Sequence, residues 1–434
     1  MGAGKLRGTK MKLLQSGRLH LACIAVLLVL ALPASAAAEQ LLRANNAGLH
    51  WVDNVRTADR EASTVLRLNT PDGRALDMSL EVQLRLTRDA TPHVAAVRDG
   101  RTQVFAGDVA ERPGSWVRLT RIGTAWLGAV HDGEQLWFLD PASHHPGLAS
   151  RLGVDDAATL VYTLADLAQP LDFHEDTAPE DFLDDTVAGH SAHHTGPYTW
   201  MPSAPQGGTD QELRITLVLD TEFQQLYPDA ASVAVAALNV VDGFYAEPGP
   251  HAHPNTRLRL HHLVALADNG PLTMTAYSQL LDAFTAFVPD QNIPFHGVAH
   301  LFSGKNFDGS VAGFAWLNAL CSATHGYAIN QMTFAGGGRA TLFAHELGHN
   351  FGVRHDNEIN LSIGITSAYV NQYCNFPTFI MAPSMSAANP ATEFSPCSSI
   401  WFEHFIPQGQ NQQCLTPLGL PFGDGFELNV LMPH

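Results

Sequence analysis

The sequence predicts an α/β domain built on a mixed sheet with packed helices, preceded by a smaller domain made mainly of β-strands. Two observations predict this order. From residue 39 to residue 164, apolar and polar residues alternate with period two between frequent turn signals, whereas strand-like and helix-like runs alternate from residue 211 onward. At 434 residues the chain is longer than one average domain, and its 45% hydrophobic content is ample for two cores.

Residues 1–36 predict a signal peptide. A basic start is followed by an apolar run from Leu21 to Leu32 and then by Ala34-Ser35-Ala36, which suits signal peptidase. The apolar run is short for a membrane span, and no later stretch approaches 18 apolar residues. We therefore expect a secreted protein that is released without a membrane anchor.

The charge balance argues against two classes of partner. With 42 acidic and 24 basic side chains, the formal net charge is -18. Such a charge disfavours binding to nucleic acid or to an anionic membrane surface. We expect a soluble, acidic monomer.

Residues 37–164 predict the β-rich domain. Runs such as 79–86 and 115–119 alternate apolar with polar residues, as strands with two different faces do. No cluster of catalytic residues stands out, and the pair His144-His145 beside Pro146 is expected to be solvated. Turns are expected at Pro71-Asp72-Gly73, at Asp99-Gly100 and at Asp132-Gly133.

Residues 165–210 predict an acidic, flexible linker, because seven carboxylates lie close together between Asp172 and Asp185. Three histidines follow, and for them an exposed polar tract is favoured over a metal site; they are His190, His193 and His194. Between Arg151 and Arg214 there is no Lys or Arg. A processing protease that cuts at basic residues therefore has no site in this linker.

Residues 211–418 predict the α/β domain, and residues 419–434 are left as a C-terminal tail. The glycines at 336–338 are expected to form a loop, so that a helix begins near Arg339 or Ala340. Strands are expected at 213–219, 258–265, 297–302 and 327–333, an extended segment at 313–317, and helices at 230–245 and 275–287.

The chemistry of this domain is concentrated in HELGHNFGVRHD, from His345 to Asp356. On a helix, His345 and His349 face the same way and can reach one metal ion. Glycine at position 352 tolerates a positive φ, which lets the chain turn and bring back His355 as a third nitrogen ligand. Three protein ligands leave a fourth position open, as in catalytic rather than structural zinc sites.

Glu346 supplies the base that such a site needs. It follows the first histidine, and it could take a proton from a water held at the metal and pass it to a leaving amine. The pattern HExxHxxGxxH fixes five positions at once, which makes it far more specific than HExxH alone. The motif therefore predicts one catalytic Zn²⁺ held by His345, His349 and His355.

Four cysteines follow the expected signal peptide, all in the last third of the chain. In an exported protein this even number predicts two disulfides. Spacing leaves all three pairings open. The cysteines are Cys321, Cys374, Cys397 and Cys414.

Together with HELGHNFGVRHD, the segment Phe379-Ile380-Met381-Ala382-Pro383 makes this domain resemble a metzincin zinc peptidase of the reprolysin (adamalysin) type, and we expect a bacterial member. In that family a turn methionine lies beneath the three histidines, and Met381 matches it. Asp356, directly after the third histidine, matches the reprolysin choice. Astacins and serralysins place a tyrosine ligand where this chain has Pro383.

The resemblance covers residues 212–416 and implies a metzincin catalytic domain with the zinc helix at its cleft. It implies a secreted endopeptidase that hydrolyses protein or peptide substrates, with residues 313–317 lining the cleft and binding substrate as an added strand. It also implies the pairs Cys321–Cys414 and Cys374–Cys397. Gly297 and Pro417 stand where calcium-binding members have an aspartate and an asparagine, so calcium is not predicted.

Two segments of the β-rich domain, 105–108 and 113–119, look like a reprolysin propeptide. The resemblance therefore implies a zymogen. No cysteine lies between Cys23 and Cys321 to block the zinc, so latency needs another group or steric cover.

Two alternatives to this prediction are disfavoured by the motif. A secreted binding protein or adhesin on an inactive peptidase fold would be favoured by loss of Glu346 or of a histidine, and none is lost. A downstream glutamate such as Glu393 could be the third ligand, but the matching GxxH makes that unnecessary.

Overall fold

The structure is a computed structural model of the whole chain, and it describes residues 43–52, 64–89, 94–167, 211–247, 254–376, 378–384 and 391–418. The expected signal peptide, the expected tail, and the expected linker beyond residue 167 with its three histidines lie outside the described residues. Within these ranges, no helix has the length and apolar character needed to cross a membrane.

The first domain, as we call residues 43–167, contains an antiparallel sheet of nine described strands in the order β1-β9-β8-β7-β6-β5-β4-β3-β2. The strands are β1 (Asn45–Asn46), β2 (His50–Val52), β3 (Thr64–Asn69), β4 (Ala75–Val82), β5 (Thr102–Val109), β6 (Trp116–Ile122), β7 (Ala125–His131), β8 (Leu136–Pro141) and β9 (Thr159–Tyr162). Its described helices are α1 (Leu84–Thr87), α2 (Ala95–Arg98) and α3 (Pro146–Leu152), with 3-10 turns at Ala142–His144 and Leu164–Asp166.

The second domain, residues 211–418, contains a mixed sheet in the order β11-β10-β12-β14-β13, with β15 beside β10. The strands are β10 (Gln211–Leu219), β11 (Thr256–Ala265), β12 (Val298–Ser303), β13 (Gly313–Ala315), β14 (Tyr327–Gln331) and β15 (Thr416–Pro417). β10, β11, β12 and β14 are parallel, whereas β13 and β15 pair antiparallel. The predicted mixed sheet is therefore confirmed.

Helices pack against this second sheet, as predicted for an α/β domain. They are α4 (Thr221–Leu226), α5 (Ala230–Ala246), α6 (Tyr277–Asp290) and α7 (Gly336–Asn350). Two further helices, α8 (Ser367–Tyr369) and α9 (Pro396–Phe405), contact the turn at Val370–Cys374 instead, and shorter turns lie at Leu361–Ile363 and Asn411–Gln413. Among these, α7 carries the HExxH segment.

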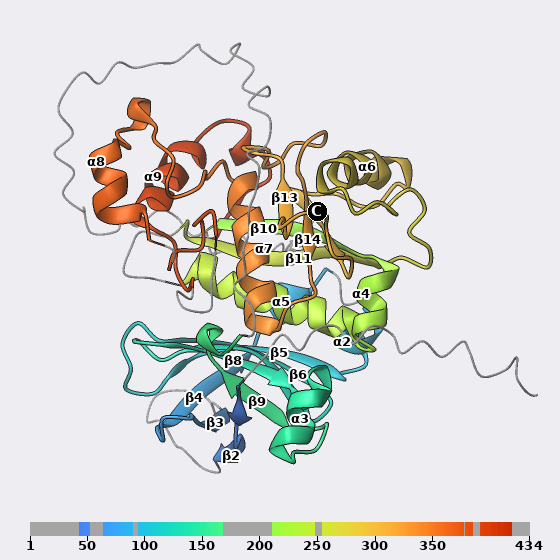
Figure 1. Cartoon of the computed structure of the whole chain (residues 1–434), viewed down its shortest axis with the longest axis vertical. Helices are drawn as coiled ribbons and strands as arrows, with labels where there is room; N and C mark the ends of the chain where they lie inside the picture. Colours follow the sequence, from blue (N-terminus) through green and yellow to red (C-terminus); the bar gives the residue numbers. More distant parts are fainter. Residues whose placement is uncertain are drawn as a thin grey trace, which may run out of the picture. The chain divides into compact units, whose positions relative to one another are not determined.

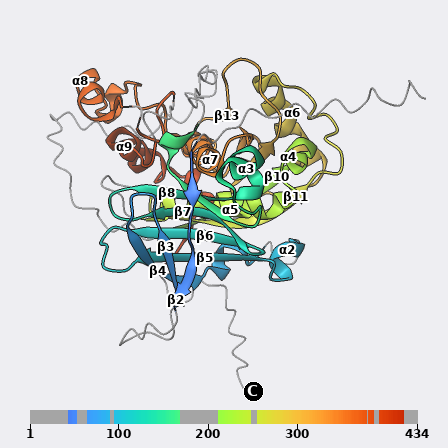
Figure 2. The same ribbon diagram turned by 60° about the horizontal axis from the view of Figure 1, so that its bottom comes forward.

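Helix α5 lies between the two sheets, in contact with β6 and β7 of the first and with β11 of the second (Figure 1). Nearly all of its side chains are buried, so a second layer must cover the face turned away from its own sheet. Figure 2 shows the first sheet providing that layer. One hydrophobic core accordingly includes Trp116 and Phe138 of the first domain together with Val235 and Leu238 of α5.

Three sequence predictions were wrong, each where the two domains meet. The run 79–86 is not one strand, because β4 ends at Val82 and Arg85 on α1 reaches Asp242 of α5 at 2.9 Å. His144 and His145 are buried rather than solvated, and both lie near Asp140. The glycines at 336–338 are the first turn of α7 rather than a loop, since the first domain binds their amides.

Candidate metal centre

Helix α7 and the turn after it bring the three predicted ligands together. One ring nitrogen from each of His345, His349 and His355 lies within 4.8 Å of the others. All three side chains are buried. The helix places the first two histidines one turn apart, and Gly352, with φ +95°, reverses the chain so that the third returns to them.

The hydrogen bonds of the histidine rings decide which ring nitrogen is free to bind a metal ion. His345 Nδ1 lies 2.6 Å from the carbonyl oxygen of Ile380, and His349 Nδ1 lies 2.8 Å from that of Val353. A carbonyl only accepts, so in the neutral rings both Nδ1 atoms carry the proton and both Nε2 atoms present lone pairs.

Those two Nε2 lone pairs face each other across 3.1 Å. Two acceptors at this distance repel unless a cation lies between them. Two nitrogens bound to a tetrahedral zinc ion at about 2.0–2.1 Å would be about 3.3 Å apart. The donor set, its spacing and its buried position therefore fit zinc.

The third histidine, His355, lies beside a carboxylate, that of Glu358. Glu358 Oε1 lies 3.5 Å from His355 Nδ1 and accepts a hydrogen bond from the backbone N of His355 at 3.2 Å. Arg354 donates to the other oxygen of Glu358 at 3.1 Å. A carboxylate behind a ligating histidine orients the ring and makes it a better donor to metal.

The methionine turn lies beneath the histidines, as the resemblance implies. A Cβ added at Gly348 would come within 2.5 Å of Met381 Sδ, so glycine is needed there for the close approach. The backbone N of Asp356 donates to Met381 O at 2.9 Å. The turn is thereby tied to the chain next to His355.

Asp356 itself is fully buried. Its Oδ1 accepts hydrogen bonds from the hydroxyls of Ser395 and Ser398, at the start of α9. Burial raises the pKa of this carboxyl to about 7, although the two hydroxyls oppose that shift. Asp356 therefore joins the third histidine to α9 rather than facing the solvent.

Glu346, the predicted base, is buried on α7 beside His345. A Cβ at Gly313 would collide with its carboxyl group, so the first residue of β13 leaves room for the glutamate. β13 pairs with β14 at the end of the described sheet. The expected cleft strand thus runs directly past the expected base.

The C-terminal end of α7 is fixed by a buried network. His300 on β12 lies 3.1 Å from Asn350 Oδ1 and 3.2 Å from Asn330 Nδ2. Burial lowers the pKa of His300 to about 3, so the ring is neutral at physiological pH. Asn350 also donates to Trp316 O at 2.9 Å, which links the helix to the segment after β13.

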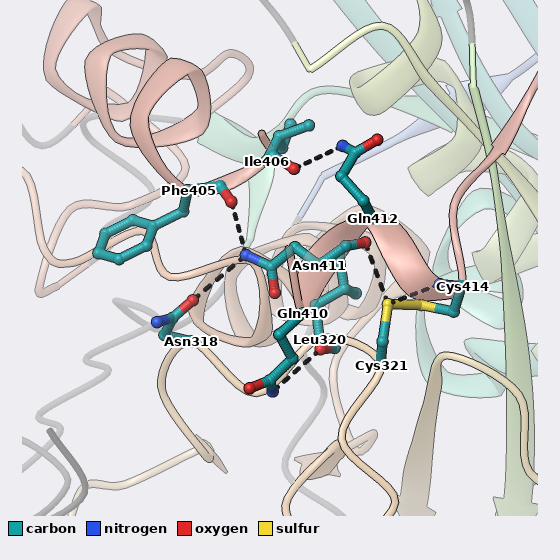
Figure 3. The surroundings of a disulfide bond; sticks show 9 residues. All are labelled: Asn318, Leu320, Cys321, Phe405, Ile406, Gln410, Asn411, Gln412 and Cys414. Atoms are coloured by element: carbon teal, nitrogen blue, oxygen red, sulfur yellow. Dashed lines mark hydrogen bonds between the residues drawn. A yellow bond between two sulfur atoms is a disulfide. The ribbon is translucent and has the colours of Figure 1, made fainter. Parts of the chain in front are cut away.

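Both disulfide pairs implied by the resemblance are present, Cys321–Cys414 and Cys374–Cys397. Figure 3 shows the first of them, where Asn411 Nδ2 donates to Asn318 Oδ1 and to Phe405 O. A Cβ at Gly352 would meet these same two residues, Phe405 and Asn318. The bridge therefore stabilises the surroundings of the turn that returns His355.

The structure brings the three predicted ligands together and places Glu346 beside His345, but the groups that support these residues were not predicted from the sequence. The carbonyls of Ile380 and Val353 are backbone groups, for which the sequence carries no signal. The sequence does carry a signal for Glu358, since a carboxylate three residues after a ligating histidine can reach that histidine. It carries no signal for Asp140, which contacts the start of α7 from the first domain.

Comparison with known proteins agrees with this geometry. Residues 209–395 match the family model Reprolysin_5, described as metallo-peptidase family M12. The matched segment is thus similar to reprolysin-type M12 metallopeptidase domains. Its three histidines match the zinc-binding site of that family.

Curated relatives include several zinc metalloproteinases. Recombinant fibrinogenase II of Deinagkistrodon acutus is 34% identical over 127 residues, which is 29% of this chain and 48% of that protein. A disintegrin-like protein of Cerberus rynchops is 30% identical over 129 residues, 29% of this chain and 19% of its own length. Brevilysin H2a of Gloydius brevicauda is 34% identical over 112 residues, which is 26% of this chain and 24% of that protein.

The chain thus spans less than half the length of each of these relatives. The family model matches residues 209–395 and so does not describe the first domain. The three relatives are snake proteins, so the expected bacterial source stays a prediction.

Proposed function

We propose that this protein is a secreted zinc endopeptidase, made as a zymogen, that hydrolyses protein or peptide substrates and acts as a monomer. His345, His349 and His355 hold one Zn²⁺, and Glu346 is the catalytic base. The observation that carries this proposal is the pair of Nε2 lone pairs of His345 and His349 facing each other 3.1 Å apart, with His355 beside them.

When bound, zinc supplies Lewis-acid chemistry, polarising a scissile carbonyl and making water a stronger acid. Glu346 takes a proton from the attacking water and delivers it to the departing amine nitrogen. Its carboxyl group is buried, which keeps bulk water away from the proton during transfer. Ile380 O and Val353 O hold the two helix histidines in the tautomer that presents Nε2.

β13 supports the proposal that substrate binds as an added strand. It is an end strand of the described sheet, and Gly313 lies against Glu346. An extended peptide paired with β13 would pass beside the base, with main-chain hydrogen bonds providing affinity. This mode suits an endopeptidase, since it recognises backbone on both sides of the cleaved bond.

The zymogen proposal rests on the propeptide-like segments 105–108 and 113–119 of the first domain, and the expected linker without basic residues between Arg151 and Arg214 supports self-maturation. Self-cleavage in that linker would separate the two domains without a basic-site protease. Sequencing the N-terminus of the secreted protein, for wild type and Glu346→Gln, tests this. Identical processing of both proteins would exclude self-maturation.

The decisive experiment for the activity uses the same variant. Glu346→Gln keeps the three nitrogen ligands, so it is expected to bind zinc like the wild type while turnover on casein falls roughly 10²- to 10⁴-fold. Near-normal turnover by Glu346→Gln would reject the assigned base. A wild type that binds zinc but cleaves nothing would favour the alternative, a secreted non-catalytic binding protein or adhesin on this fold.

A further inference from the structure

The zinc helix begins with residues that do not favour a helix. Its first three positions are Gly336, Gly337 and Gly338, and Ala335 before them offers no side-chain cap. Each glycine costs about 1 kcal/mol relative to alanine inside a helix. The first backbone N–H groups of a helix also need partners from outside it. This turn therefore depends on contacts made by another part of the chain.

Two side chains of the first domain make those contacts. Asp140, on β8, accepts a hydrogen bond from the backbone N of Gly336 at 2.7 Å. The hydroxyl of Tyr162, at the end of β9, accepts one from Gly337 N at 3.0 Å and donates to Asp140 Oδ2 at 2.7 Å. A carboxylate at a helix N-terminus is also favoured by the helix dipole.

The glycines are what allow this approach. A Cβ at Gly336 would lie 2.8 Å from Asp140 Oδ1, and a Cβ at Gly337 would lie 2.7 Å from Leu164 Cδ2 and 2.8 Å from Phe138. Any larger residue would push the first sheet away. The first two glycines of the triplet are thus explained by the fit of the first domain rather than by a turn.

A buried charge pair lies directly behind the cap. Arg339 donates to Asp140 Oδ1 at 3.2 Å and to Tyr227 OH at 2.6 Å, and it is almost fully buried. Burial alone would raise the pKa of Asp140, but Arg339 and the neighbouring His144 and His145 hold it well below its usual range. Asp140 therefore stays ionised, as a cap and counter-ion must.

His144 extends the cluster to the start of α5. Its ring lies 3.8 Å from Asp140 Oδ1 and 3.5 Å from Asp229 Oδ1. His145 Nε2 lies 3.2 Å from Asp140 Oδ2. The two oxygens of Asp140 thus serve donors from both domains, and no neutral side chain of that size offers as many acceptors.

We propose that Asp140 is a positioning residue for the zinc site, which holds the first turn of α7 from the first domain. The ligands His345 and His349 lie further along the same helix, the first of them about 13 Å from Gly336 at about 1.5 Å per residue. Because a helix is stiff over this length, fixing its first turn also fixes the direction in which both rings point. This proposal rests on the function proposed above only in taking the metal to be zinc.

This role has a consequence for maturation. If the first domain separates, Gly336 and Gly337 lose their partners and Arg339 loses its carboxylate. The helix is then expected to begin at Arg339 or Ala340, where the sequence alone places its start. The extended helix is thus the form that exists with the first domain in place.

Amide hydrogen exchange and zinc binding test the proposal on the full chain in the Glu346→Gln background, which prevents self-cleavage. Asp140→Asn replaces one carboxylate oxygen, which accepts hydrogen bonds, with an NH₂ group, which can only donate and would face other donors. We expect exchange at residues 336–339 to accelerate roughly tenfold to a hundredfold, and zinc affinity, measured by chelator competition, to fall about tenfold.

Asp132→Asn is the matched control. Asp132 is also a buried aspartate of the first domain, in the turn between β7 and β8, but it accepts hydrogen bonds from Trp137 Nε1 at 3.1 Å and from the backbone amides of Glu134 and Gln135. It is expected to change the exchange at 336–339 and the zinc affinity less than about twofold. Equal values for Asp140→Asn and Asp132→Asn in both measurements would overturn the proposal.

Tyr162→Phe is a second variant, for use if Asp140→Asn does not fold. It removes only a hydroxyl, and exchange at Gly337 is expected to accelerate about threefold to tenfold. Unchanged exchange at Gly337 would equally overturn the proposal. A protein that binds no zinc at all would defeat the proposed function instead, while the exchange comparison would still decide whether Asp140 holds the turn.

Discussion

The two ends of helix α7 are stabilised by different parts of the chain and by different chemistry. The first turn is bound by side chains of the first domain, Asp140 and Tyr162. The end that carries the histidines is bound by backbone carbonyls of its own domain, those of Ile380 and Val353. Local contacts therefore set the tautomers of the ligand histidines, whereas the cap of the first turn, and through it the direction of the helix, depends on the first domain.

The two ends of α7 should therefore be sensitive to different changes. The first turn depends on a buried ion pair, so it is sensitive to removal of a single charge. The ligand end depends on three histidine ligands and on the neutral ring of His300, so it is sensitive to removal of the metal and, through His300, to acid. Variants at each end should therefore give different readouts.

The largest effect is expected at the ligand end. His349→Ala removes one of three protein ligands, so zinc is lost and with it several kcal/mol of transition-state stabilisation, roughly a thousandfold in rate. Metal analysis and casein turnover on one preparation measure both losses. His404→Ala, an exposed histidine on α9, is the control and should keep zinc. Full zinc content in His349→Ala would contradict the ligand assignment.

At the first turn, Arg339→Met leaves Asp140 buried without its cation. The free energy of unfolding is expected to fall by about 3–5 kcal/mol while one zinc per chain is retained. Arg354→Met, which breaks the partly exposed pair with Glu358, should cost less than about 1 kcal/mol. Urea unfolding of both variants gives the comparison, and equal losses would mean that the Asp140–Arg339 pair contributes no more than a surface pair.

Acid should weaken the ligand end first. The folded protein holds His300 neutral down to about pH 3, while the unfolded chain protonates its histidines near pH 6.5, so lowering pH between these values favours unfolding. The loss from this residue at pH 5 is about 2 kcal/mol. Asp140, with its lowered pKa, contributes stability above about pH 4 and loses it only as pH falls further.

His300→Gln separates this contribution from the rest of the molecule. The variant lacks the titrating ring, so its free energy of unfolding should change less between pH 7 and pH 5 than that of the wild type. Urea unfolding at the two pH values measures the difference. A variant with the wild-type dependence on pH would refute the role given to His300.

The smallest effect is expected at the methionine turn. Met381→Leu conserves volume and should cost less than about 1.5 kcal/mol with zinc retained. Gly348→Ala should cost more, because its Cβ would lie 2.5 Å from Met381 Sδ. Thermal unfolding ranks the two variants. The reverse order would show that the helix does not pack closely on the turn.

The sequence predicted the ligand end well because its signals are local. The spacing of His345, His349 and His355 and the glycine between the last two specify a helix followed by a reversal. The central parallel strands β10 and β12 also stand out in the sequence, because residues 213–219 and 298–303 are mostly apolar, as in buried strands. The disulfide pairing followed only from the family resemblance, and it is confirmed.

The first turn could not be predicted because its partner lies far away in the sequence. Asp140 and Gly336 are 196 positions apart, and glycine triplets ordinarily form loops. His144 looked solvated because its partners, Asp140 and Asp229, come from both domains. Arg118, at a polar position of β6, is likewise buried against Asp242 of α5. In each case a contact with a residue far away in the sequence overrides the local pattern.

Zinc content and peptide hydrolysis, measured together on the secreted wild-type protein, test the central claim most directly. One zinc ion per chain is predicted, with hydrolysis of a broad peptide library that is lost on chelation and restored by added zinc. A protein with one tightly bound zinc and no hydrolysis of any peptide, before or after removal of the first domain, would contradict the account.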